Sequence, residues 1–126
     1  MLQTLTTPRG ETLSGTPWQV YPRPQMRRDS YINLNGEWDF AVSSGKPETF
    51  DMRITVPFCP ESRLSGIGRH FEEGAPLWYR RRFLLPEGFR RERVLLHIGA
   101  ADQIAEVFVN GQYLCRHEGG YASFCV

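Results

Sequence analysis

The segment "HEGGY" gathers, within five positions, residue types that often contact a ligand or a neighbouring surface. His117 can change its charge near neutral pH, Glu118 carries a carboxylate, and Tyr121 combines an apolar ring with a hydroxyl group. Gly119 and Gly120 permit backbone conformations and close approaches that other residues do not. Two interpretations follow: the segment is a contact surface, or it is a sharp turn after a hairpin.

Acidic side chains are the next group that could do chemistry. Hydrolysis of a glycosidic bond usually needs two carboxyl groups about 5 to 9 Å apart. Most acidic residues fall on the outward faces of expected strands or in turns, and no spacing forces two of them together: Glu37, Asp39, Glu72, Glu73, Glu87 and Glu92. No serine lies in a nucleophile elbow, and no Cys/His pair is persuasively spaced. We predict no catalytic residue and no cofactor.

Three tryptophans could offer flat faces to sugar rings, each with an indole N–H free to donate. Trp38 lies on the apolar face of an expected strand, which favours a place in the core. Trp18 is expected to pin an N-terminal arm to the surface. Trp78 opens a strand beside a long loop, so it joins the candidate contact residues, together with Glu61 from that loop.

Composition limits the possible partners. The chain has 126 residues and a net charge of +1, which gives no field that would attract nucleic acid or an anionic membrane. No apolar run approaches the length of a membrane span, and the first residues lack the apolar region of a signal peptide. Fourteen residues are arginine and one is lysine. Arginine recognises carboxylates and phosphates, but the arginines are scattered, which favours a genome-wide codon bias.

The cysteines are odd in number and form no compact framework: Cys59, Cys115 and Cys125. This pattern favours free thiols in a reducing compartment, so we expect a cytoplasmic protein. The spacing of cysteines and histidines fits no standard zinc pattern, and we predict no metal site.

The elements that would position these residues are strands. Residues 34–42, "LNGEWDFAV", alternate with a period of two, and residues 52–56, 78–85 and 93–100 are further strand candidates. The last of these is apolar on both faces, so we expect a central strand in which His97 is a half-buried, satisfied histidine. Asn110 and Gly111 separate two alternating runs, which predicts a two-residue hairpin.

No segment has a sustained 3.6-residue period, so the predicted class is all-β, as a sandwich or jelly roll. Residues 1–30 are rich in proline, glycine and threonine, and they are expected to form an extended arm without a helix. Residues 31–126 are expected to form the domain. A long loop, residues 57–76, is expected to do more than connect two strands.

Five motifs occur in order along the chain: "YPRPQMRRDSYINLNGEWDF", "VPFCPESRLSGIG", "LWYRRRF", "LLHIGAADQIAEVFVNG" and "HEGGYASF". This series resembles the N-terminal sugar-binding domain of glycoside hydrolase family 2, the β-galactosidase and β-glucuronidase family. The resemblance runs from Tyr21 to the last residue. It implies a galactose-binding-like jelly roll within a retaining exo-glycosidase, whose two catalytic glutamates lie in a separate (β/α)₈ barrel.

The resemblance also implies a place for the candidate residues. In some family members, loops of this domain reach the mouth of the active site, and one carries an acidic residue near the sugar. Here the corresponding stretch is "RHEGGY", whose acidic member is Glu118, and its form is closer to the glucuronidase side of the family. The family domain continues through further strands, so we expect this chain to lack the last strands of the domain and to be inactive alone.

Three functions remain open at this point. The chain is a part of a glycosidase that shapes the active site of its catalytic barrel, a free-standing carbohydrate-binding module, or a structural interaction domain. An unpaired sheet edge would be a template for association, which predicts a possible homo-oligomer.

Overall fold

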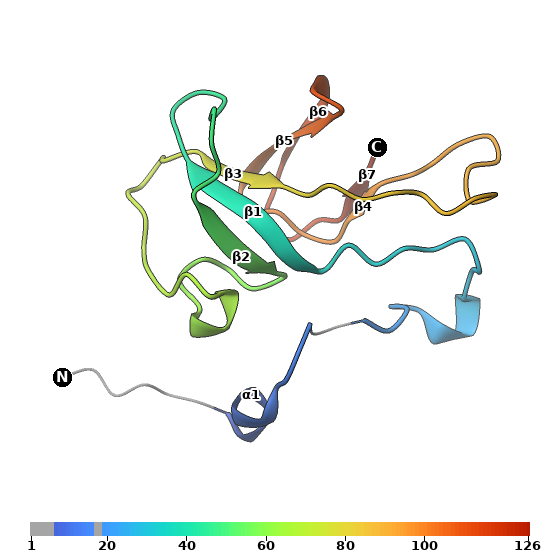
Figure 1. Ribbon diagram of the computed structural model, residues 1–126, viewed down its shortest axis with the longest axis horizontal. Helices are drawn as coiled ribbons and strands as arrows, with labels where there is room; N and C mark the ends of the chain where they lie inside the picture. Colours follow the sequence, from blue (N-terminus) through green and yellow to red (C-terminus); the bar gives the residue numbers. More distant parts are fainter. Residues whose placement is uncertain (1–6, 17–18) are drawn as a thin grey trace. The chain divides into compact units, whose positions relative to one another are not determined.

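The structure of the protein is a computed structural model that describes residues 7–16 and 19–126 (Figure 1). The chain forms two compact units, Met1–Leu84 and Leu85–Val126, and each unit is considered by itself. Unit 1 is the first of these and unit 2 the second. Among the described residues, no helix has the length and apolar character to cross a membrane.

Unit 1 is built on a three-stranded antiparallel sheet with the strand order β2-β1-β3. β1 spans Gly36–Val42, β2 spans Met52–Val56 and β3 spans Leu77–Arg80. The first two strands confirm the sequence-based prediction, because period-two alternation marks a half-buried strand.

The core of unit 1 centres on β1. Phe40 and Ile54 are fully buried, and the Phe40 ring contacts the rings of Phe71 and Tyr79 at centroid distances of 5.6 and 5.1 Å. Ala41 is also buried, although alternation places it on the opposite face. β1 is therefore covered on both faces at its centre, which a simple inward-outward pattern does not predict.

β3 ends earlier than its sequence suggests. Alternation predicts a strand to residue 85, but pairing with β1 stops at Arg80, opposite Asp39. The next side chain takes over the hydrogen bonding: Nη1 of Arg81 donates to the carbonyl oxygens of Glu37 and Asn35 at 3.1 and 3.3 Å. A guanidinium group thus satisfies acceptors of β1 that a longer β3 would face.

The long loop between β2 and β3 is held by internal hydrogen bonds. It contains the 3₁₀ turn η2, Arg63–Ser65. The hydroxyl group of Ser65 is buried, donates to the carbonyl oxygens of Ser62 and Pro60, and accepts from the backbone N–H of Ile67. This loop is therefore a folded part of unit 1.

The N-terminal segment corrects one expectation. It contains the short helix α1, Pro8–Thr12, and the 3₁₀ turn η1, Pro24–Met26, where no helix was predicted. The helix has a specific cause: the Thr7 side chain accepts from the backbone N–H of Gly10, and Pro8 occupies the first helical turn. Trp18, expected to pin this segment, lies outside the described residues. The division into an arm and a domain at residue 30 stays a prediction.

Unit 2 contains the predicted hairpin. β5, Ile104–Val109, pairs antiparallel with β6, Gln112–Glu118. Asn110 and Gly111 connect the strands with φ angles of 52° and 78°. Two consecutive residues with positive φ define a type I′ turn, so the hairpin prediction is confirmed.

The remaining strands of unit 2 are short. β4, His97–Ile98, pairs with β7, Phe124–Cys125, and paired backbone hydrogen bonds between Leu96 and Val126 extend this contact. The prediction of a central strand covered on both sides is wrong, because within the described part of the chain this strand pairs with β7 alone, and Leu95 beside it is 52% exposed. His97 is likewise exposed.

The final segment also differs from expectation. Although the chain was expected to lack the last strands of its domain, its final residues form a paired strand, because β7 pairs with β4. The described residues form an all-β fold with three separate antiparallel sheets, none of them closed, which confirms the predicted class of an incomplete β-sandwich.

Candidate functional site

The end of β6 and the turn that follows it contain four of the predicted contact residues, His117, Glu118, Gly119 and Tyr121. β6 ends at Glu118, and the backbone N–H of Gly119 donates to the carbonyl oxygen of Gln103 at 2.8 Å, which closes the base of the hairpin. A Cβ atom at Gly120 would overlap the carboxylate of Asp102. The closeness of the Asp102 side chain therefore explains this glycine, and residues 120–121 form a turn, as one of the two interpretations expected.

His117 and Glu118 point into different surroundings. The imidazole ring of His117 stacks on Phe124, with ring centroids 4.1 Å apart and planes inclined by 11°. Its Nδ1 atom is buried and has no hydrogen-bond partner among the described residues. The carboxylate of Glu118 forms an ion pair with Arg116. His117 is thus a packed side chain, while Glu118 remains at the surface.

Tyr121 is the most accessible of the four residues. Its side chain is fully exposed, so both the ring face and the hydroxyl group are free to meet a ligand or a protein surface. The turn therefore brings the four candidates together in the chain, but only Glu118 and Tyr121 present functional groups to solvent.

The two candidates from unit 1 have partners of their own. The indole N–H of Trp78 donates to the carbonyl oxygen of Ser43 at 3.0 Å, and the ring is half-buried. A carboxylate oxygen of Glu61 lies 3.6 Å from Nδ1 of His70, whose side chain is exposed. The donor that was expected to be free on Trp78 is therefore used within unit 1.

Tyr79, on β3, has the one shifted pKa among the described residues. Burial against the core raises the pKa of its hydroxyl group to about 12, and the nearby negative charges of Glu61 and Cys59 act in the same direction. The neutral phenol is therefore favoured at every physiological pH, which suits a structural role beside Phe40 and not that of a general base.

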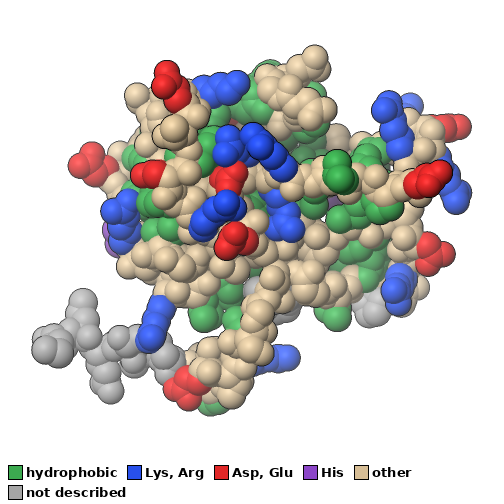
Figure 2. All heavy atoms as spheres, viewed as in Figure 1, with side chains coloured by type: hydrophobic (Ala, Val, Ile, Leu, Met, Phe, Trp, Pro, Cys, Tyr) green, Lys and Arg blue, Asp and Glu red, His purple; other side chains and the backbone are tan. Residues whose placement is uncertain are grey.

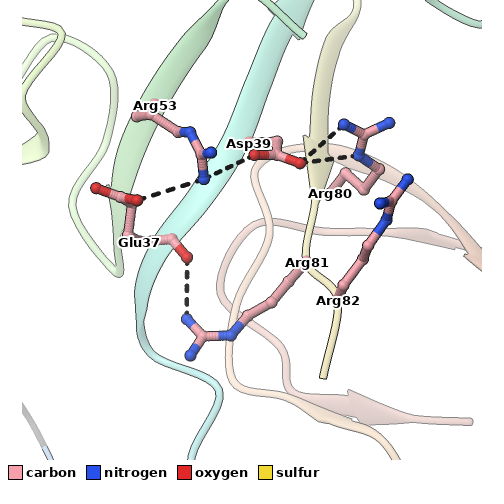
Figure 3. A pocket seen from close by; sticks show the side chains of 6 residues that line it. All are labelled: Glu37, Asp39, Arg53, Arg80, Arg81 and Arg82. Carbon is pink, nitrogen blue, oxygen red and sulfur yellow. Dashed lines mark hydrogen bonds and ion pairs between the residues drawn. The ribbon is translucent and has the colours of Figure 1, made fainter. Parts of the chain in front are cut away.

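An arginine-lined hollow on unit 1 was missed by the sequence analysis. It is an open depression of about 330 Å³, and six side chains line it: Glu37, Asp39, Arg53, Arg80, Arg81 and Arg82 (Figure 3). On the face shown in Figure 2, arginine side chains surround acidic ones near the centre of the molecule.

Ion pairs organise this arginine hollow. Oδ2 of Asp39 accepts from Nε and Nη2 of Arg80, both at 2.9 Å, and Oδ1 lies 2.8 Å from Nη1 of Arg53 (Figure 3). The same Nη1 atom of Arg53 lies 3.3 Å from Glu37. The feature that could have revealed this cluster is the pairing of the strands: Asp39 lies opposite Arg53 on β2 and opposite Arg80 on β3. Outward-facing acids and arginines become neighbours only when the register is known.

Metal ligation has little support in the described part of the chain. No group of three or more His, Cys, Asp or Glu side chains is placed to hold an ion there, and the three cysteines are free.

Comparison with known proteins identifies relatives. The chain is 45% identical to a β-glucuronidase of Chlorocebus aethiops and 38% identical to a β-glucuronidase of Paenibacillus borealis, and each match covers 83% of this chain. A shorter match, covering 37% of the chain at 36% identity, relates it to a β-galactosidase of Thermoanaerobacter pseudethanolicus. No protein-family model matches the chain.

The coverage of the relatives is as informative as the identity. The matched part of this chain corresponds to 19% of the length of each of the two β-glucuronidases, so the chain spans about a fifth of the length of these relatives. The five ordered motifs and the matches agree: the chain belongs to glycoside hydrolase family 2, the β-galactosidase and β-glucuronidase family.

Proposed function

We propose that this chain is the N-terminal sugar-binding and scaffolding domain, or part of it, of a retaining exo-glycosidase of the β-glucuronidase or β-galactosidase type. In this role it shapes the mouth of an active site whose catalytic barrel belongs to the same parent chain. The observation that carries the proposal is the pair of coverages, 83% of this chain but 19% of each β-glucuronidase. The rest of each β-glucuronidase, which this chain does not match, is long enough to contain a catalytic domain.

The described carboxylates support this division of labour. Glu37 and Asp39 are the acidic pair that shares a hollow, and both contact the guanidinium group of Arg53. Asp39 also receives two hydrogen bonds from Arg80. A retaining glycosidase needs one free nucleophile and one proton donor, whereas these two groups are engaged as ion-pair partners. They are suited to hold three strands together.

The turn after β6 is the best candidate for contact with the sugar or the barrel. Tyr121 is fully exposed, and Glu118, at the end of β6, carries a surface carboxylate. Gly120 allows the backbone to pass close to Asp102, which gives the turn a fixed path. A rigid turn with an exposed aromatic ring can position a substrate at low entropic cost.

The alternative of a free-standing carbohydrate-binding module has less support. Such a module needs exposed tryptophans that form a platform, but the indole N–H groups of Trp38 and Trp78 donate to the backbone carbonyls of Leu34 and Ser43, at 2.7 and 3.0 Å. Both rings are half-buried. Calorimetric titration with galactose and xylose oligosaccharides separates the two functions, because binding at millimolar concentration or tighter would favour the module.

The first experiment tests whether the chain acts alone. The purified 126-residue chain is incubated with nitrophenyl β-glucuronide and nitrophenyl β-galactoside, and release of nitrophenol is followed by absorbance. We expect no turnover above buffer. Turnover by the purified chain that survives a second chromatographic step would overturn the proposal.

A second experiment tests the scaffolding role directly. A chimera carries this chain in place of the matched segment of the Paenibacillus borealis β-glucuronidase, and kcat and KM are measured. Tyr121→Ala is expected to raise KM severalfold, whereas Tyr113→Ala, an exposed tyrosine on β6 outside the turn, leaves KM unchanged. Equal effects of the two substitutions would contradict a contact role for the turn.

Two further parts of the proposal concern assembly and location. β2 and β3 are the outer strands of their sheet, and such edges favour pairing with another copy of the chain. A monomer at high concentration in sedimentation would count against the homo-oligomer. The three free cysteines favour a reducing compartment, as in the cytoplasm.

A further inference from the structure

The arginine hollow of unit 1 carries more positive charge than its internal ion pairs use. Four arginines and two carboxylates line it, so its formal charge is four minus two, or +2. The whole chain has a net charge of only +1. Positive charge is therefore concentrated on one small part of the surface, around Asp39 of β1 and the arginines opposite it on β2 and β3.

Two of the four guanidinium groups are already neutralised. Arg80 is engaged by Asp39, and Arg53 is shared between Asp39 and Glu37. These contacts fix the floor of the hollow, and the guanidinium group of Arg80 also lies over the ring of Phe50 at 4.0 Å. A carboxylate that arrives from outside therefore meets a preformed surface and does not have to break these pairs.

The other two guanidinium groups keep their charge. Arg81 donates only to the neutral carbonyls of Asn35 and Glu37. Gly36 makes room for this arrangement, because a Cβ atom there would lie 3.2 Å from Nη1 of Arg81. Arg82 forms no hydrogen bond or ion pair with any described residue, and in Figure 3 its side chain extends along the hollow toward Arg80.

We propose that the arginine hollow is a docking site for a carboxylate, in which the free fork of Arg82 binds the two oxygens and Arg81 supplies a second positive charge. One guanidinium fork matches one carboxylate bidentately. The same fork also matches a phosphate group, so phosphate is the competing anion that the test must compare with carboxylates. The group can come from a free sugar acid or from an acidic side chain of a protein segment, and the two share the same chemistry.

This inference stands on contacts within unit 1 and does not depend on the proposed glycosidase role. The chain can fail as a scaffold and still bind a carboxylate, and the reverse also holds. A turnover assay and an anion titration therefore give separate answers.

The test is an NMR titration of the 126-residue chain that follows the arginine side-chain Nε–Hε signals at low ionic strength. Sodium glucuronate probes the sugar acid, N-acetylglutamate amide probes the acidic side chain, glucose is the uncharged control and inorganic phosphate the competing anion. We expect saturable shifts of Arg82 and Arg81 with both carboxylates, with a dissociation constant on the order of millimolar because the site is open. Physiological salt should weaken binding.

Three variants make the test specific. Arg82→Gln should weaken carboxylate binding about threefold to fivefold, the effect typical of an exposed charge pair. Arg82→Lys keeps the charge but loses the fork, and it should also weaken binding. Arg63→Gln removes an exposed arginine of η2 outside the hollow and should change nothing.

The outcomes separate clearly. Tighter binding of glucuronate than of the glutamate derivative identifies a sugar acid, and equal binding identifies carboxylates in general, including acidic side chains. Equal shifts with glucose, tighter binding of phosphate, full affinity in Arg82→Lys, or an equal loss in Arg63→Gln would each overturn the proposal.

Discussion

Asp39 is the residue on which the three strands of unit 1 converge, and its replacement by asparagine should destabilise that unit measurably. Its carboxylate accepts two hydrogen bonds from Arg80 at 2.9 Å and lies 2.8 Å from Nη1 of Arg53. Its side chain is only 19% exposed. Asparagine keeps the size of the side chain and one carbonyl oxygen, but it loses the negative charge and one acceptor. Two guanidinium groups would then face each other without the anion between them.

The magnitude follows from the exposure of the partners. A hydrogen bond to a charged group contributes about 1.5–3 kcal/mol when it is shielded, while an exposed ion pair contributes about 0.2–1 kcal/mol. Arg53 and Arg80 are 63% and 40% exposed, so solvent screens both interactions. With three contacts of intermediate strength, we expect Asp39→Asn to lower the free energy of unfolding by about 2 kcal/mol.

Glu37 provides the matched control on the same strand. Among the described residues, its one ion pair is a 3.3 Å contact with Arg53, and its side chain is 68% exposed. Glu37→Gln should therefore cost less than about 0.5 kcal/mol. The comparison separates an organised ion pair from a general effect of removing negative charge beside four arginines.

Urea unfolding followed by tryptophan fluorescence is the appropriate assay, because all three tryptophans precede residue 85 and report on unit 1. The Asp39→Asn effect should shrink only partly in about 1 M salt, where the screening length is near 3 Å, since Asp39 is mostly shielded. A loss in Glu37→Gln equal to that in Asp39→Asn would refute the reasoning, and so would an Asp39→Asn variant with unchanged stability.

Three further predictions follow from the core, the hairpin turn and the buried phenol. Phe40→Ala should cost about 3–5 kcal/mol in the same assay, while Phe83→Ala, half exposed, costs under about half of that. Gly111→Ala should destabilise the hairpin by about 1 kcal/mol because φ is positive, seen as faster amide exchange in β5 and β6, whereas Gly99→Ala changes little. Tyr79 should ionise near pH 12 by ultraviolet titration. The pKa of this hydroxyl group in the unfolded chain is near 10, so its contribution to stability should be constant below pH 10 and be lost toward pH 12. Because the ring is 40% exposed, we expect a loss of only about 1 kcal/mol in the free energy of unfolding. Tyr79→Phe should remove this dependence on pH.

The parts of the fold that local signals specify could be predicted from the sequence. Alternation in residues 34–42 identified β1, and Asn110-Gly111 identified the β5–β6 hairpin with its turn type. In both cases the sequence signal itself is carried by a few neighbouring residues. The type I′ turn needs only two residues that tolerate positive φ.

The elements that depended on distant partners were predicted poorly. The apolar stretch around Leu95 suggested a central strand, but a strand is central only if partners pair with both edges, and β4 pairs with β7 alone. β3 was predicted too long because alternation does not show that the Arg81 side chain takes over the carbonyls of Glu37 and Asn35. Short helices such as α1 arise from one cap and are hidden among turn-forming residues.

The candidate site shows the same limit at the level of side chains. Residue types suggested that Trp78 offers a free donor and His117 a titratable group. In the structure, the donor of Trp78 is used by Ser43 and the ring of His117 is stacked on Phe124. Availability of a functional group is a property of packing, so a list of chemically able residues is always longer than the list of accessible ones.

The motifs that identify the family also have structural roles in this chain. "NGEWDF" supplies Gly36, the ion-pair acceptor Asp39 and the core residue Phe40, and "WYRRRF" supplies Arg80 and Arg81, which bind to that same strand. These residues hold the sheet together and need no substrate to explain them. A chain can therefore carry clear marks of a glycosidase family while its described residues offer structural ion pairs in place of a catalytic pair. The arginine hollow is lined by residues of both motifs, and the ion pairs that secure the strands leave Arg82 without a partner among the described residues, available for the proposed carboxylate.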